Sequence, residues 1–117
     1  MSVFRDVIIP YGGVDVIVTP SNKVLRRIEG KGKRDDPSFN LVELIIRVNS
    51  GAGSLYDAAF VLAELINSAD VSTTEDDALV YMQGMDNAAE YRAFLDLLVS
   101  CVMPEPKPKK PEAQPEA

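Results

Sequence analysis

Residues 104–117 read PEPKPKKPEAQPEA, a segment that cannot build a hydrophobic core. It holds five prolines, three lysines and three glutamates, and no large apolar side chain. With nothing apolar to bury, it cannot offset the conformational entropy lost on ordering. Because proline does not continue a helix, the apolar run that precedes residue 104 must also end there. The sequence therefore predicts a single globular domain at residues 1–103 and a disordered tail at residues 104–117.

The domain has the composition of a globular protein. Apolar residues make up 46% of the chain, and its length suffices for one hydrophobic core. No apolar stretch reaches the ~18–20 residues that span a bilayer. The opening residues MSVFRD carry a charge pair where a signal peptide needs apolar side chains. We therefore expect a soluble cytoplasmic protein without membrane contact.

The residue types available argue against an enzyme. The chain has no histidine, so it lacks the commonest general base, the commonest zinc ligand and every Ser-His or Cys-His nucleophile pair. Cys101 is the only cysteine, and its place on the apolar side of the last predicted helix favours a small buried hydrophobe over a reactive thiol. We expect no catalytic residues, no cofactor and no small-molecule substrate.

Three polar motifs have plain structural explanations. The acidic clusters Asp35-Asp36 and Glu75-Asp76-Asp77 lack EF-hand spacing and suit helix starts, so no metal site is predicted. Gly30-Lys31-Gly32-Lys33 resembles a phosphate loop but lacks the GxxxxGK[ST] pattern between a strand and a helix. For residues 30–36 we predict a solvated loop between helices, with contact to an anionic partner as the second interpretation and nucleotide binding as the least favoured.

Charge is unevenly distributed in a chain of net charge −6. Residues 23–34 carry six cations against Glu29 alone, whereas residues 35–103 carry twelve acids against two arginines. So acidic a body repels phosphate, and we expect no nucleic-acid partner. The predicted partner-binding residues are the basic ones of this segment and of the tail: Lys23, Arg26, Arg27, Lys31, Lys33, Arg34, Lys109 and Lys110.

The N-terminal part predicts a β-hairpin over residues 3–19. Residues 3–9 and 14–19 are rich in β-branched side chains, and Pro10-Tyr11-Gly12-Gly13 between them is a turn sequence in which the glycines take positive φ. Two strands alone are marginal in water. The hairpin must therefore pack on helices of its own chain or pair with a strand of another chain.

Four to five short helices are predicted over about residues 20–103. Cap signals place their starts at Thr19-Pro20, Asp36-Pro37, Ser54, the capping box of residues 72–75, and Asp86 or Asn87. The second helix is expected to run through the apolar residues Phe39, Val42, Ile45, Ile46 and Val48. The predicted fold class is α+β, mostly α-helical. Because each helix has a strongly apolar face, we expect one face to be left for a partner or a second copy.

The segment VDVIVTPSNKVLRRIEG, residues 14–30, resembles the opening of the tail assembly chaperones of long-tailed bacteriophages. In that family a short strand pair runs into a helix with the pattern apolar–basic–basic–apolar–Glu–Gly, which residues 25–30 match. Several short helices and a Pro/Lys/Glu-rich end follow. At the level of architecture the similarity covers roughly residues 5–103.

The resemblance implies a non-enzymatic assembly factor. Such a protein binds the tape measure protein, keeps it soluble while tail tube subunits gather, and is absent from the finished virion. Lys109-Lys110 offers a point where ribosomes could slip to make a longer form. The alternatives are another acidic cytosolic binder, such as a secretion-type chaperone or a regulatory protein, and a structural tail or neck subunit.

Overall fold

The computed structural model describes residues 5–103. The predictions for residues 3–4, for the tail at 104–117 and for Lys109 and Lys110 lie outside the described residues. The elements, in chain order, are β1 (Val7–Tyr11), β2 (Val14–Val18), α1 (Asn22–Asp35), α2 (Leu41–Asn49), α3 (Leu55–Ser68), α4 (Glu75–Gln83) and α5 (Ala88–Val102). The predicted fold class is confirmed: a hairpin precedes a mostly helical domain.

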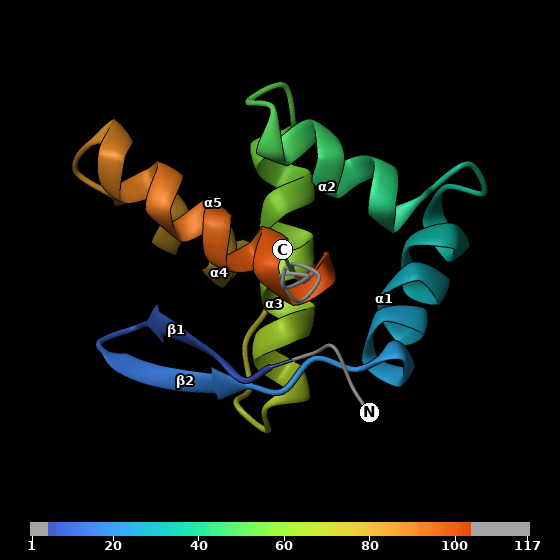
Figure 1. Cartoon of the computed structure of the whole chain (residues 1–117), viewed down its shortest axis with the longest axis horizontal. Coiled ribbons are helices and arrows are strands. Elements are labelled where there is room, and N and C mark those ends of the chain that lie inside the picture. The colour runs from blue at the N-terminus through green and yellow to red at the C-terminus, as the bar shows by residue number, and fades with distance from the viewer. Residues whose placement is uncertain (1–4, 104–117) are drawn as a thin grey trace, which may run out of the picture.

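Helix α3 occupies the centre of the domain, and the other elements are arranged around it (Figure 1). It contacts α1, α2, α4, α5 and β2. Because it is covered from several sides, it is apolar on more than one face. Its buried residues are Ala58, Ala59, Val61, Leu62, Ala63, Leu65 and Ile66.

The hairpin is antiparallel, with Ile8 opposite Ile17 and Ile9 opposite Val16. The predicted four-residue turn was wrong, because Pro10 and Tyr11 belong to β1 and the turn is Gly12-Gly13 alone. These glycines have φ of 60° and 87°. Positive φ at both central positions is characteristic of the type I′ turn, whose twist matches that of the strands, and glycine reaches it without strain.

The hairpin packs on helices of its own chain. Ile9, Val16 and Val18 are buried in the core. At the turn end, the Tyr81 hydroxyl of α4 donates a hydrogen bond of 2.8 Å to the Pro10 carbonyl. The rings of Tyr11 and Tyr81 lie 4.9 Å apart between centroids. Of the two arrangements left open by the sequence, the structure shows the intramolecular one.

Helix α1 differs from the prediction at both ends. Its N-cap is Ser21, whose hydroxyl oxygen accepts from the Val24 N–H at 3.2 Å, rather than Thr19. Thr19 instead donates to the Asp6 carboxylate at 2.9 Å. The helix continues to Asp35, so the predicted loop at residues 30–36 was wrong. Tertiary packing overrides the low helix propensity of glycine here.

The reason for the continuation lies at Gly32. This residue is buried, and a Cβ added to it would lie 2.5 Å from the ring of Phe39. The Phe39 ring in turn packs edge-on against Phe60 of α3, with centroids 5.8 Å apart. Glycine therefore allows α1 to approach an aromatic pair that joins it to the core.

Helix α2 begins at Leu41 with Asn40 as its N-cap, not at the predicted Asp36-Pro37. Asp36 ends α1 instead: its N–H donates to the Gly32 carbonyl at 3.0 Å. Its carboxylate accepts from the Ser38 N–H and hydroxyl at 3.0 and 2.7 Å. These two hydrogen bonds hold the pKa of Asp36 below its usual value. An Asp-Pro pair can thus close one helix before a short turn rather than open the next.

The other helix boundaries follow the predicted signals closely. Ser54 caps α3 as predicted, and Asn87, one of the two residues predicted to start the last helix, caps α5. The N-cap of α4 is Thr74, two residues after the predicted Ser72, and its C-cap is Gly84, near which the helix was predicted to stop. Helix α5 ends at Val102.

Cys101 lies in the core with no exposed surface. Burial raises the pKa of its thiol to about 12. A thiol held protonated and covered is neither nucleophilic nor accessible, so the predicted structural role is confirmed. Among residues 5–103, no helix has both the length and the apolar content to cross a membrane.

Candidate functional site

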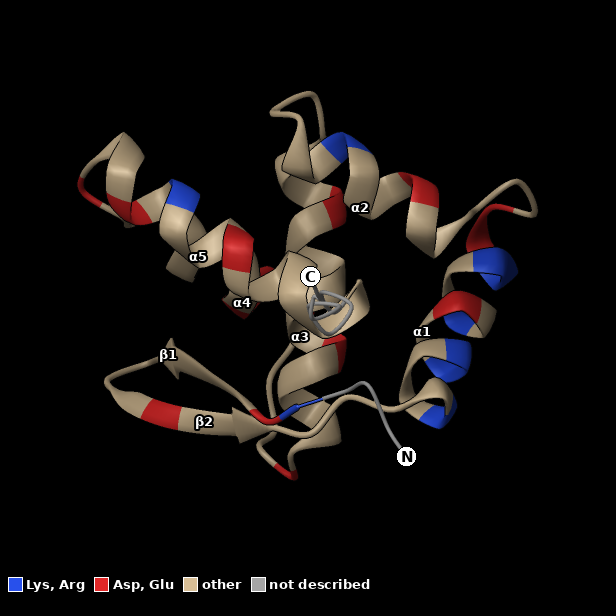
Figure 2. Cartoon of the chain, in the orientation of Figure 1, with Lys and Arg blue, Asp and Glu red and all other residues tan. Residues whose placement is uncertain are grey.

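The six cations predicted for partner binding within the described residues all lie on α1. They stand out as the densest group of basic residues in Figure 2, on a helix at the edge of the domain. All are exposed except Lys31, which is partly covered. A single helix therefore carries most of the positive charge of an otherwise acidic domain.

The structure divides these cations by what their side chains contact. Lys31 forms a salt bridge of 2.9 Å with Glu64 of α3, whose side chain is only 12% exposed. This pair fastens α1 to the central helix. Lys31 thus has a structural partner and is a weaker candidate for intermolecular binding than the sequence indicated.

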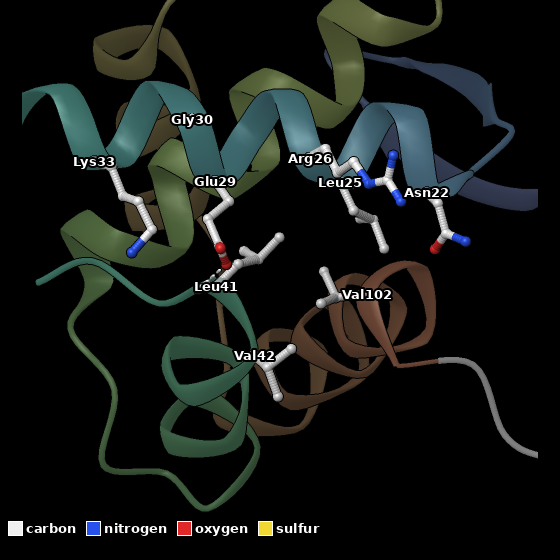
Figure 3. Close-up of a pocket in the computed structure, with 9 residues that line it drawn as sticks. All are labelled: Asn22, Leu25, Arg26, Glu29, Gly30, Lys33, Leu41, Val42 and Val102. Atoms are coloured by element: carbon white, nitrogen blue, oxygen red, sulfur yellow. Dashed lines mark hydrogen bonds between the residues drawn. The ribbon is translucent and has the colours of Figure 1, made fainter. Parts of the chain in front are cut away.

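Two other cations, Arg26 and Lys33, lie beside a groove between α1, the start of α2 and the end of α5 (Figure 3). The groove has a volume of about 330 Å³. Its lining residues are Asn22, Leu25, Arg26, Glu29, Gly30, Lys33, Leu41, Val42 and Val102. Lys23, Arg27 and Arg34 do not line it, so the structure does not bring all six cations to one site.

Apolar side chains from three helices meet in this groove. Leu25 comes from α1, Leu41 and Val42 from the first turn of α2, and Val102 from the last turn of α5 (Figure 3). Leu41 and Val102 are almost fully buried and form the base, whereas Val42 is 49% exposed. The groove therefore combines an apolar surface with charges along its α1 side.

The charged groups of the groove are arranged in a definite order. Lys33 lies toward one end, Arg26 lies toward the other, and Glu29 lies between them (Figure 3). The Glu29 carboxylate accepts a hydrogen bond of 3.1 Å from the Leu41 N–H. The Lys33 ammonium donates a hydrogen bond of 2.7 Å to the Phe39 carbonyl. Because a carbonyl group is neutral, this hydrogen bond does not neutralise the charge of Lys33.

The apolar surface extends along the outer face of α2. Val42 and Ile46, one turn apart, are 49% and 51% exposed, so these two apolar residues of the helix face outward rather than into the core. The residues that α2 buries are Leu41, Leu44, Ile45 and Val48. In nine residues this helix carries six aliphatic side chains, which is more than one face can bury.

A second exposed apolar surface lies on the outer face of the hairpin. The cross-strand pair Ile8 and Ile17 is 55% and 58% exposed. The helices cover only one face of this two-stranded sheet, the face that carries Ile9 and Val16. The groove, by contrast, combines its apolar surface with charged side chains of α1.

Sequence reasoning missed the groove because its residues come from three separate segments. Asn22, Leu41 and Val102 have no shared motif that points to a common site. The excess of aliphatic residues in α2 was the one available signal, since it shows that some of them must face outward. The acidic clusters gave no further site: among residues 5–103 no three acidic or thiol side chains gather as metal ligands.

Comparison of the chain with protein-family models, with curated proteins and with solved structures finds no match.

Proposed function

We propose that this protein is a non-enzymatic tail assembly chaperone of a long-tailed bacteriophage, acting in the host cytoplasm. Its client would be the tape measure protein, a long helical protein that needs protection while tail tube subunits assemble. The observation that carries the proposal is the apolar surface of the groove and of α2, which remains uncovered within a domain that has already buried its core.

Two further features support it. The segment in which the sequence resembles the chaperone family, residues 14–30, comprises β2 and the first part of the basic helix α1. The acidic remainder of the domain suits a protein that must hold an apolar client without aggregating, because net charge keeps such complexes soluble.

The test is co-expression with the tape measure protein encoded by the same genome. We expect that protein to remain soluble and to co-purify with this chain, and to aggregate when expressed alone. Mass spectrometry of purified virions should not detect this chain. If the chain is present in virions, it is a structural tail or neck subunit. If the tape measure protein is not bound and a secreted protein is, a secretion-type chaperone is indicated.

A second measurement concerns the gene. We expect a slippery sequence at the codons for Lys109-Lys110 and a longer product that shares residues 1 to about 109. Mass spectrometry of the expressed products detects that form directly. A single product of one length would remove the support that the lysine pair lends to the proposal.

A further inference from the structure

The two cations beside the groove have a separation that defines a ligand. Arg26 and Lys33 are seven residues apart on α1, so their backbone positions are about 10 Å apart along the helix axis. Across the groove from α1, the apolar side chains Leu41, Val42 and Val102 lie along the stretch between them, and Leu25 lies beside Arg26 on α1 itself (Figure 3). An occupant therefore meets a positive charge, an apolar base and a second positive charge in that order.

We propose that this groove binds an amphipathic helix of a partner protein, with two carboxylates seven residues apart and apolar side chains between them. This groove proposal depends on the proposed function in one respect: the client protein is the source of the helix. Residues seven apart lie on the same face of a helix and about 10 Å from each other, which matches the spacing of Arg26 and Lys33.

A helix fits this groove better than an extended peptide. The groove is lined by three helices, and no strand borders it, so there is no sheet edge for strand addition among its lining residues. At about 330 Å³ it is at the small end of ligand pockets, and takes a few inserted side chains rather than a whole segment. A helix lying over the groove would insert the residues of its apolar face and leave its backbone hydrogen bonds intact.

The charges select an acidic helix and fix its register. Residues 35–103 carry twelve acids and two arginines, so an acidic partner is repelled by most of the surface and attracted to α1. Glu29 lies between the two cations, and its carboxylate repels a third carboxylate at the centre of the ligand. A ligand with acidic residues at its two ends and apolar residues in the middle is complementary to Arg26, Glu29 and Lys33 together.

The nearest competing occupant is this chain's own segment 104–117, which begins two residues after Val102. Glu105 and Glu112 in that segment are seven apart, but the intervening residues include three prolines and no large apolar side chain. It therefore offers nothing to contact Leu25, Val42 and Val102. Nucleic acid would use the cations without the apolar base.

The experiment measures binding of labelled helical peptides to the full chain by fluorescence anisotropy. The test peptide carries two glutamates seven residues apart, with leucines three and four positions after the first glutamate. One control peptide replaces the glutamates by lysines, and another replaces the leucines by alanines. We expect only the test peptide to bind, and its affinity to fall as salt rises.

Matched variants locate the site. Arg26→Glu, Lys33→Glu and Val42→Asp should each weaken binding by about tenfold or more. Arg27→Glu, on the same helix but outside the groove, and Val80→Asp, at an exposed valine of α4, should leave it unchanged. The lysine peptide should bind the Arg26→Glu, Lys33→Glu double variant better than the wild type. Melting curves confirm that each variant is folded.

Several outcomes would overturn the inference. If Arg27→Glu lowers the affinity for the test peptide as much as Arg26→Glu does, α1 attracts acidic peptides through its charge alone and the groove is not required. Competition by a peptide of residues 104–117 would assign the groove to the chain's own tail. Single-stranded RNA that displaces the test peptide and binds the Val42→Asp variant undiminished would point to a nucleic-acid surface.

The two proposals fail separately. If Val42→Asp keeps the tape measure protein soluble as well as the wild type does, the groove proposal is wrong and the function stands. If the peptides and variants show the expected affinities but the tape measure protein does not co-purify with this chain, the groove proposal stands and the proposed function is wrong.

Discussion

Helices α1 and α3 both contain fourteen residues, but they bury very different shares of them. Seven residues of α3 are buried, compared with Ile28 and Gly32 in α1. Helix α1 carries six lysines and arginines, and α3 carries none. The comparison shows that α3 supplies the core around which the domain forms, whereas α1 is fastened to it at a few points and leaves a groove at its side.

The attachment of α1 consists of a few contacts of different kinds. Ile28 inserts into the core, and Gly32 lies against the ring of Phe39. The Lys31–Glu64 salt bridge reaches α3, and Glu29 accepts from the Leu41 N–H. Because these contacts are specific and separate, each can be removed alone, so the contrast with α3 can be tested residue by residue.

The largest expected effect is in α3. Leu62→Ala should lower the free energy of unfolding by about 2–5 kcal/mol, because it opens a cavity at a fully buried position. Leu25→Ala, the same change at a half-buried position of α1, should cost less than about 1 kcal/mol. Urea unfolding followed by circular dichroism measures both. Equal losses would mean that α1 contributes as much to the core as α3, and the contrast would be wrong.

Two glycines of α1 should respond in opposite directions. Gly32→Ala should destabilise the domain by about 1–3 kcal/mol, because the new methyl group overlaps the Phe39 ring. Gly30→Ala should stabilise it by up to about 1 kcal/mol, because this helical position is open and alanine favours the helix. The measurement is the shift in Tm for each variant. A loss at both positions would indicate that residues 30–35 are not helical.

Alkaline pH should lower the free energy of unfolding through Cys101, which is buried in the core. The folded pKa of Cys101 is raised from its ordinary value of 9.0 to about 12, so its contribution is complete below pH 9 and is lost as pH rises toward 12. Between pH 8 and pH 10 this amounts to about 1 kcal/mol. Urea unfolding at the two pH values should show this decrease in the free energy of unfolding for the wild type, and a smaller decrease for Cys101→Ala. Identical decreases in both proteins would mean that the thiol ionises in the folded state.

The smallest effect is expected at the salt bridge. Lys31→Ala should cost about 1 kcal/mol, because it leaves the mostly buried Glu64 carboxylate without its partner. Lys23→Ala, at an exposed position of the same helix, should change the free energy of unfolding by less than about 0.5 kcal/mol. If both changes are neutral, the ion pair does not fasten α1 to α3.

The sequence predicted the type and order of the elements better than their boundaries. Caps at Ser54 and Asn87 were identified because a short polar side chain precedes a regular apolar pattern. The starts of α1 and α2 were misplaced because Thr19-Pro20 and Asp36-Pro37 imitate cap signals, and the residues that cap lie two and four positions later. The helical course of residues 30–35 depends on the contact between Gly32 and Phe39, which local propensity does not contain.

The candidate site was predicted only in part. The basic segment indicated that α1 carries the charge, and the charge pattern is a property of the sequence alone. The apolar base depends on the meeting of Leu25, Leu41 and Val102, which are brought together by tertiary packing. Such a site becomes visible only when the crossing of the three helices is known.

The packing of the hairpin on α5 has a consequence for synthesis. β1 and α5 are in contact, yet their sequences are separated by nearly the whole domain. At about 5–20 residues per second, α5 leaves the ribosome several seconds or more after the hairpin. Until then the buried face of Ile9 and Val16 has only partial cover from the earlier helices, so part of that face stays exposed on the nascent chain. Folding of this domain therefore finishes only with its last helix, and the hairpin is the part most in need of protection during translation.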